Sequence, residues 1–209
     1  MAMAHDSPKL ATPATDLAMA LDPALFALAA GFTPDPWQAQ VLRSRSPRIL
    51  LNCSRQSGKS TVVAMLAMWT ALYCPGSLTL IVSPAERQSK ELFRKALAVY
   101  RALGRPVPPQ SESALQLELD SGSRIIALPG KEGTIRGYSG VDLIAIDEAA
   151  RVPDETYQAV RPMIAVSGGR IIALSTPFGT RGWWYQEGMG IGGDGLSRRQ
   201  VQPPAGTPL

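Results

Sequence analysis

The sequence predicts an α/β protein whose central sheet is mostly parallel, with helices on both faces and one β-hairpin. Three observations predict this fold. Short apolar runs typical of buried strands alternate with longer helical patterns along the chain, as in proteins built from strand–helix–strand units. A polar loop ending in Gly-Lys-Ser joins one of these strands to a helix. Two acidic residues follow directly after another buried strand.

The expected elements follow one another from Asp22 onward. Asp22 and Pro23 have the pattern of a helix cap and a first-turn proline, and they predict a short helix to Ala30. Residues 33–46 carry apolar side chains at helical spacing. The remaining patterns predict buried strands at 49–51, 78–82, 143–146 and 170–174, helices at 61–73, 86–103 and 153–166, and a β-hairpin from 115–119 and 124–128.

The composition predicts one folded domain between two tails. Residues 1–22 are rich in Ala, Pro, Thr and Asp and are expected to be a flexible N-terminal tail. Residues 23–187 form the domain. Residues 188–209 are rich in Gly, Pro, Ser and Arg, lack apolar periodicity, and are expected to be disordered. A chain of 209 residues with 45% hydrophobic content suffices for one substantial core but not for two full domains.

Charge and cysteine content exclude several classes of protein. The chain has 21 Lys and Arg against 17 Asp and Glu, a net charge of +4 that is compatible with a nucleic-acid partner. No apolar run of membrane-spanning length and no signal peptide are evident. Two cysteines exclude a disulfide framework and fit a reducing cytoplasm. The single His5 makes histidine-based catalysis improbable.

Residues 53–60, Cys-Ser-Arg-Gln-Ser-Gly-Lys-Ser, have the Walker A pattern of a phosphate-binding loop. Backbone N–H groups of such a loop and the N-terminus of the following helix attract anions. Lys59 is expected to reach the β- and γ-phosphates of ATP, and the Ser60 hydroxyl to hold Mg²⁺. The loop begins with Cys53 where the consensus has Gly, whereas Gly58 is kept. The other positions expected to contact the nucleotide are Ser54, Gln56, Ser57, Gly58 and Thr61. The alternative is an ordinary loop entering an ordinary helix.

The strand at 143–146 ends in Asp147 and Glu148, 88 residues after Lys59 (147 − 59). Open α/β sheets bind their ligands at the carboxyl ends of the strands. Asp147 is therefore expected to hold Mg²⁺, and Glu148 to act as the general base that activates the attacking water. The alternative without a catalytic role is a strand followed by acidic side chains that face solvent. Together the two motifs predict a P-loop NTPase of the RecA-like, ASCE type that hydrolyses ATP.

The order of the motifs resembles the ATPase domain of phage terminase large subunits, the motors that package DNA. Four stretches carry the resemblance, which covers about residues 30–187; they are 32–38, 54–60, 135–140 together with 147–150, and 174–177. That family often lacks the first Gly of the loop and carries an internal Arg. The individual tetrapeptides are weak signals, but their order and spacing are specific.

The resemblance assigns roles to further residues. It implies that Gln38, with Trp37 beside it, contacts adenine; the residues alone are equally consistent with a core Trp and a surface Gln. It also implies that Arg55 acts on the γ-phosphate rather than facing solvent. Arg136 fits either an arginine finger that enters a neighbouring subunit's site or a surface or DNA-facing arginine.

Two further stretches have competing interpretations. Ser175 and Thr176 end a strand beside the acidic strand, where they could sense the γ-phosphate and pass the signal on; the alternative is a simple turn before Pro177. The run Trp183-Trp184-Tyr185 could stack on bases, but a packed helix at the domain edge is the preferred interpretation.

The leading functional expectation is a viral DNA-packaging ATPase that uses ATP and Mg²⁺. The resemblance implies double-stranded DNA, a homo-oligomeric ring, a portal and a small terminase subunit as partners, no membrane, and the host cytoplasm as location. Complete large subunits carry a second, nuclease domain, for which 21 residues after Gly188 leave no room (209 − 188). Three interpretations of this chain therefore remain open: an isolated domain, a separately encoded motor half or an inactive prophage remnant. A helicase-like translocase is the other alternative.

Overall fold

The computed structural model describes residues 12–129, 135, 137–176, 179, 181–188 and 198–201, the last four by their backbone alone. Its strands are β1 (Arg48–Asn52), β2 (Leu78–Ser83), β3 (Pro109–Glu112), β4 (Gln116–Leu119), β5 (Arg124–Pro129), β6 (Leu143–Asp147), β7 (Arg170–Ser175) and β8 (Arg198–Val201). Its helices are α1 (Pro13–Leu21), α2 (Pro23–Ala29), α3 (Pro36–Arg43), α4 (Lys59–Tyr73), α5 (Glu86–Ala102), α7 (Asp154–Ala165) and α8 (Gly182–Gly188), with a 3-10 turn, η1, at Ala149–Arg151.

The strands form one sheet in the order β3-β4-β5-β2-β6-β7-β1-β8. The run from β5 to β8 is parallel, and the hairpin β4–β5 and strand β3 extend it in antiparallel pairing. Strand β7 lies between β1 and β6, with Asn52 paired to Ser175 and Asp147 paired to Leu174. The carboxyl ends of these three strands are therefore level at one edge of the sheet. The predicted α/β fold, with its mostly parallel sheet and hairpin, is confirmed.

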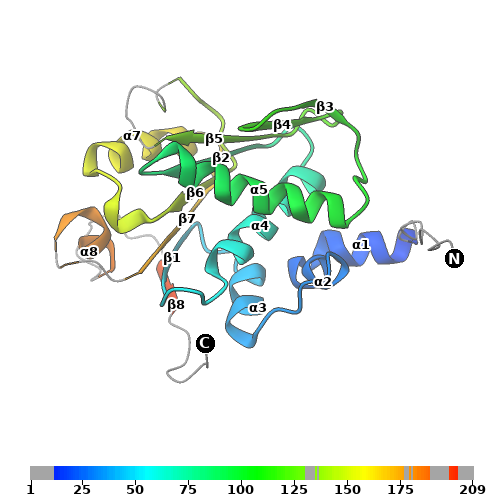
Figure 1. Cartoon of the computed structure of the whole chain (residues 1–209), viewed down its shortest axis with the longest axis horizontal. Coiled ribbons are helices and arrows are strands. Elements are labelled where there is room, and N and C mark those ends of the chain that lie inside the picture. The colour runs from blue at the N-terminus through cyan, green and yellow to red at the C-terminus, as the bar shows by residue number, and fades with distance from the viewer. Residues whose placement is uncertain are drawn as a thin grey trace, which may run out of the picture.

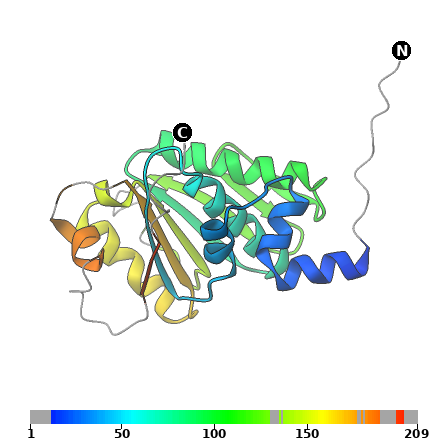
Figure 2. The same ribbon diagram turned by 90° about the horizontal axis from the view of Figure 1, so that it is seen from below.

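Helices cover both faces of the sheet. Side chains of a strand alternate between its faces, so Ile49 and Leu51 join one core cluster while Leu50 joins the other. The first cluster packs under α2, α3, α4 and α5, and the second under α7 and α8. Figures 1 and 2 show α4 and α5 on one face of the sheet and α7 and α8 on the other.

The expected flexible tail at 1–22 is wrong over 13–21, which forms α1. Thr12 caps this helix by accepting from the backbone N–H of Thr15 at 3.2 Å. The indole N–H of Trp69, 50 residues later, donates to the carbonyl of Met19 at 2.9 Å, and Met19 itself is buried. The helix is therefore stabilised by distant contacts rather than by a strong local pattern. Residues 1–11 lie outside the described residues.

The expected disorder of 188–209 also fails at one point. The backbone of 198–201 forms β8, the outermost strand on one side of the sheet, which pairs in parallel with β1 (Figure 1). Most of the remaining C-terminal residues lie outside the described residues. Strand β3 was not expected either, because its residues are exposed and polar and its partner is the hairpin strand β4.

The other expected helices and strands are present within a few residues of their predicted bounds. Helix α2 begins as predicted, with the Asp22 carboxylate accepting from the backbone N–H of Ala24 at 2.8 Å. In the part of the chain that the structure describes, no helix combines the length and apolar character needed to cross a membrane.

Candidate active site

The phosphate loop leaves the buried end of β1 and turns directly into α4. Gly58 caps α4 in the left-handed region (φ 79°), and its carbonyl accepts from the backbone N–H groups of Thr61 and Val62 at 3.0 and 3.1 Å. The loop residues are exposed at 54–56 and half-buried at 57–61. The N-terminus of α4 therefore opens at the carboxyl edge of the sheet, where the sequence predicts phosphate binding.

Lys59 lies across this loop. Its Nζ donates a hydrogen bond to the carbonyl of Ser54 at 3.0 Å. Burial lowers the pKa of Lys59, while the negative charges of Asp147 and Glu148 raise it. The Walker A lysine and the two acids at the end of β6 are therefore close enough for their charges to interact.

Asp147 ends β6 with a half-buried carboxylate whose Oδ1 accepts from the backbone N–H of Glu148 at 2.9 Å. Burial raises the pKa of Asp147, as does the charge of Glu148, whereas Lys59 and Lys95 lower it. Asp147 offers a desolvated carboxylate at the end of β6, and Ser60 offers a half-buried hydroxyl at the start of α4. Oxygen donors of this kind fit a hard divalent cation. The described residues contain no group of three His, Cys, Asp or Glu suited to a metal, and Mg²⁺ commonly uses one or two protein ligands plus phosphate oxygens.

Glu148 has an unusual backbone. It lies in the left-handed region (φ 48°, ψ 41°) and caps the η1 turn, with its carbonyl accepting from the Arg151 backbone N–H at 2.8 Å. Non-glycine residues in this region carry strain and concentrate at functional sites. The Glu148 side chain is 41% exposed, and its carboxylate oxygen Oε2 lies 3.9 Å from the Arg151 guanidinium Nε. Glu148 is thus presented to solvent beside Asp147, as a general base requires.

Ser175 connects the two motifs. Its backbone carbonyl accepts from the N–H of Cys53, the first residue of the phosphate loop, at 3.1 Å. Its Oγ accepts from the N–H of Ala150, two residues after Glu148, at 3.3 Å. Thr176 follows in a half-buried position at the same edge. The predicted site residues at the ends of β1, β6 and β7 are therefore brought together.

The adenine-side residues differ from the expectation. Trp37 is 8% exposed and packs in the core cluster beneath α3 and α4, so the structure places it in the core rather than at a nucleotide surface. Gln38 is buried, and its amide nitrogen donates to the carbonyl of Ser57 in the phosphate loop at 3.1 Å. The burial of Gln38 was not evident from the sequence, where an aromatic–Gln pair at the start of a helix fits core and binding roles equally.

The structure describes only one of the two arginines predicted to act on phosphate. Arg55 is exposed within the phosphate loop, and Arg136 lies outside the described residues. Sequence analysis missed two cations, Lys95, whose charge lowers the pKa of both Lys59 and Asp147, and Arg151 beside Glu148. Lys95 occupies the middle of the amphipathic helix α5, where no local signal marks it.

The aromatic run in α8 is a packed helix. Trp183 and Trp184 are buried, and the Trp183 ring stacks on Tyr157 with centroids 3.9 Å apart and planes 7° apart. The Trp183 indole N–H donates to the carbonyl of Val152 at 2.9 Å. The preferred interpretation of this stretch, packing rather than base stacking, agrees with these contacts.

Comparison with known proteins gives consistent matches. The family described as terminase large subunit, T4likevirus-type, N-terminal, matches residues 50–186. The terminase large subunits of Thermus phage G20c and Thermus virus P23-45 are each 28% identical over an alignment of 176 residues that covers 75% of this chain and 36% of theirs. The chain thus spans about a third of the length of these curated relatives.

Solved structures with the same fold include two of the large terminase ATPase domain of Thermus phage P74-26. One, a mutant, has a TM-score of 0.75 at 22% identity and covers 85% of this chain and 84% of its own. The other has a TM-score of 0.70 at 25% identity and covers 77% and 71%. The large terminase of the thermophilic bacteriophage D6E in complex with ADP has a TM-score of 0.61 at 14% identity, covering 86% and 44%. Because the family match spans more than half of the 209 residues, this chain belongs to the terminase large subunit family, in which it corresponds to the N-terminal part.

Proposed function

We propose that this chain is an ATPase whose hydrolysis of ATP drives double-stranded DNA into a viral capsid. One observation carries the proposal: the phosphate loop that leads to Lys59 and the turn that holds the consecutive Asp147 and Glu148 lie at the same end of neighbouring strands, joined by the two hydrogen bonds of Ser175. That arrangement supports a site with a cation for phosphate, a carboxylate for a metal and a general base at the carboxyl ends of neighbouring parallel strands.

Each residue has a defined task in this proposal. Lys59 and the backbone N–H groups of the loop from Ser54 to Thr61 bind the phosphates. Ser60 and Asp147 would hold Mg²⁺, which would supply positive charge to the phosphate oxygens. Glu148 accepts a proton from the attacking water. Arg55, and Arg136 from the same or a neighbouring subunit, are the candidate cations for the transferred phosphoryl group.

Ser175 and Thr176 have the task of coupling the state of the phosphate loop to the turn that follows Glu148. The two hydrogen bonds of Ser175 join the phosphate loop to the turn that follows Glu148. A shift of the loop on γ-phosphate binding or release would therefore move that turn as well. Thr176, the next residue, lies half-buried at the same edge.

The proposal extends to partners. The net charge of +4 is compatible with DNA. By the family resemblance, we propose a ring of like subunits, a portal and a small terminase subunit as further partners. The host cytoplasm is the compartment in which such a motor would work. A helicase-like translocase would share the same site, and an inactive remnant would bind ATP or DNA without turnover.

Phosphate release measured with and without double-stranded DNA tests this function. We expect Mg²⁺-dependent ATP hydrolysis that DNA stimulates and that Lys59→Ala abolishes. Lys90→Ala is a matched control, because Lys90 is an exposed lysine paired to Glu86 within α5. Binding of ATP without turnover by the wild-type chain would favour the remnant, and stimulation by single-stranded nucleic acid alone would favour the helicase-like translocase.

A further inference from the structure

The side-chain amide of Gln38 is hydrogen-bonded at both of its polar atoms. Its Oε1 accepts from the backbone N–H of Asp35 at 2.8 Å, at the start of α3. Its Nε2 donates to the carbonyl of Ser57 at 3.1 Å, in the phosphate loop. The residue is 4% exposed. This one side chain therefore joins the N-terminus of α3 to the loop that precedes Lys59.

Gly58 shows how closely the amide fits against the loop. A Cβ atom added at Gly58 would lie 2.6 Å from Gln38 Nε2, closer than real Cβ contacts occur. Gly58 also has a φ of 79°, which disfavours any L side chain. The amide thus occupies the space above Gly58 and fixes the peptide between Ser57 and Gly58.

The orientation of that peptide matters to the anion site. When Gln38 holds the Ser57 carbonyl, the N–H of Gly58 points in the opposite direction, because the carbonyl and N–H of one peptide unit are antiparallel. The capping geometry of Gly58 then starts α4 at Lys59. The amide keeps a second N–H and a second acceptor lone pair, but the side chain is 4% exposed. A nucleobase edge could therefore reach these groups only if the buried side chain moved.

We infer that Gln38 is a positioning residue that braces the phosphate loop, and that base selectivity at this site does not depend on its amide. This inference rests on the proposed function, because it concerns the same nucleotide site. It replaces the adenine contact implied by the family resemblance with a contact to the loop backbone.

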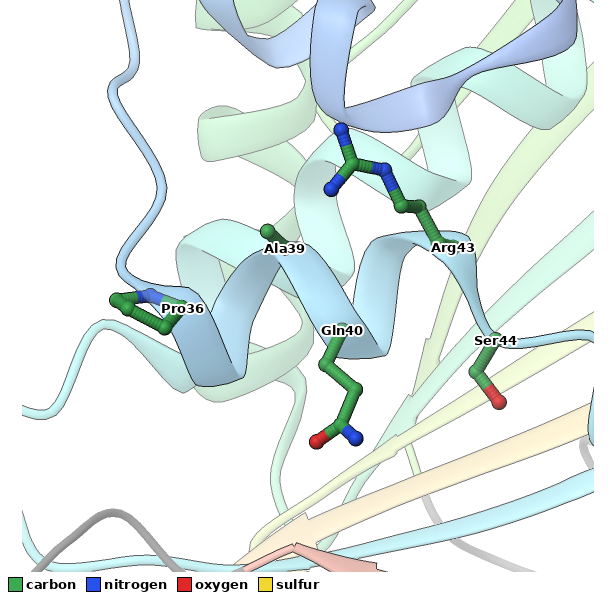
Figure 3. Close-up of a pocket in the computed structure, with 5 residues that line it drawn as sticks. All are labelled: Pro36, Ala39, Gln40, Arg43 and Ser44. Atoms are coloured by element: carbon green, nitrogen blue, oxygen red, sulfur yellow. The ribbon is translucent and has the colours of Figure 1, made fainter.

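Helix α3 offers a matched control two residues away. Gln40 is exposed, and Figure 3 shows its side chain extending away from α3 into an open hollow lined by Pro36, Ala39, Gln40, Arg43 and Ser44. Gln40→Met thus makes the same chemical change on the same helix without touching the loop. Gln38→Met keeps the size of the side chain and removes both hydrogen bonds. Gln38→Glu keeps the acceptor for Asp35 and removes the donor to Ser57.

The first measurement is amide hydrogen exchange of the nucleotide-free protein. We expect faster exchange over residues 54–60 in both Gln38 variants than in wild type or Gln40→Met, with strands β2 and β6 unchanged. Unchanged exchange in the loop of a variant that keeps the wild-type exchange in β2 and β6 would overturn the inference. This readout does not require the protein to bind or hydrolyse ATP.

The second measurement compares Kd values for ATP, GTP and inorganic tripolyphosphate. We expect Gln38→Met and Gln38→Glu to weaken all three by one common factor, about tenfold for a lost hydrogen bond, so that the ratio of ATP to GTP affinity stays at the wild-type value. Loss of ATP preference with unchanged tripolyphosphate binding would instead assign Gln38 to adenine. If wild type binds none of the three, the proposed function fails, while hydrogen exchange still decides whether Gln38 braces the loop.

Discussion

The backbone carbonyl of Ser175 accepts a hydrogen bond from the backbone N–H of Cys53 at 3.1 Å, which ties the end of β7 to the first residue of the phosphate loop. The Ser175 hydroxyl makes a second bond, accepting from Ala150 N–H at 3.3 Å. Because Ser175 is 4% exposed, water does not readily replace either bond. Movement of the loop and movement of the Glu148 turn are thereby joined through one residue.

Ser175→Ala removes the hydroxyl bond and leaves the backbone bond to Cys53. We expect ATP affinity to stay within about twofold of wild type and kcat to fall about tenfold, the scale of one hydrogen bond, because the Glu148 turn loses a fixed contact. Ser167→Ala is the control, since the Ser167 hydroxyl bonds to Val141 at 2.6 Å at the opposite edge of the sheet. A fall in ATP affinity with unchanged kcat would assign Ser175 to nucleotide binding instead.

Glu148→Gln should bind ATP but hydrolyse it about 10²–10⁴ times more slowly, because an amide cannot accept the proton of the attacking water. Single-turnover hydrolysis and ATP binding should be measured together. Glu155→Gln, an exposed change in the first turn of α7, is the control. Near-wild-type turnover by Glu148→Gln would require another base.

Sequence alone predicted the features of this molecule that depend on residues close together in the chain. Asp147 directly follows an apolar run that defines a buried strand, and Lys59 follows another after a short polar loop. The parallel sheet then brings the strand ends together. The position of Ser175 at the end of β7 was also predicted, but its bonds to Cys53 and Ala150 were not, since they depend on strand order.

Other features depend on contacts between distant segments and have no local signal. Helix α1 is held by Trp69, which lies 50 residues from Met19. Trp37 and Gln38 are buried because α4 and the phosphate loop pack against α3. An aromatic residue followed by Gln gives the same pattern whether it faces a core or a ligand, so the pattern could not distinguish these roles.

Tyr157 predicts a stability change at high pH. Burial, together with the nearby carboxylate of Glu187, raises the pKa of Tyr157 to about 12, against about 10 in an unfolded chain. Its contribution to stability is therefore fully present below pH 10 and is lost as the pH rises towards 12. Tyr157→Phe keeps the stack on Trp183 and should show a shallower fall in the free energy of unfolding between pH 9 and 11, measured with urea. Identical slopes for the two proteins would show that this phenol is not buried in solution.

Turnover should depend on assembly if Arg136 acts on a neighbouring subunit's site. Arginines supplied in trans raise phosphoryl-transfer rates by about 10³–10⁵. Arg136→Ala keeps an intact site without the finger, and Lys59→Ala keeps the finger without the site, so a mixture should recover activity that neither variant shows alone.

Mixing Arg55→Ala with Lys59→Ala is the control, because Arg55 lies in the same loop as Lys59 and serves its own site. That mixture should stay inactive. The measurement is ATP turnover against protein concentration, with and without DNA. Absence of recovery at concentrations where wild-type subunits assemble would remove Arg136 from the finger role and leave Arg55 as the phosphate-directed arginine.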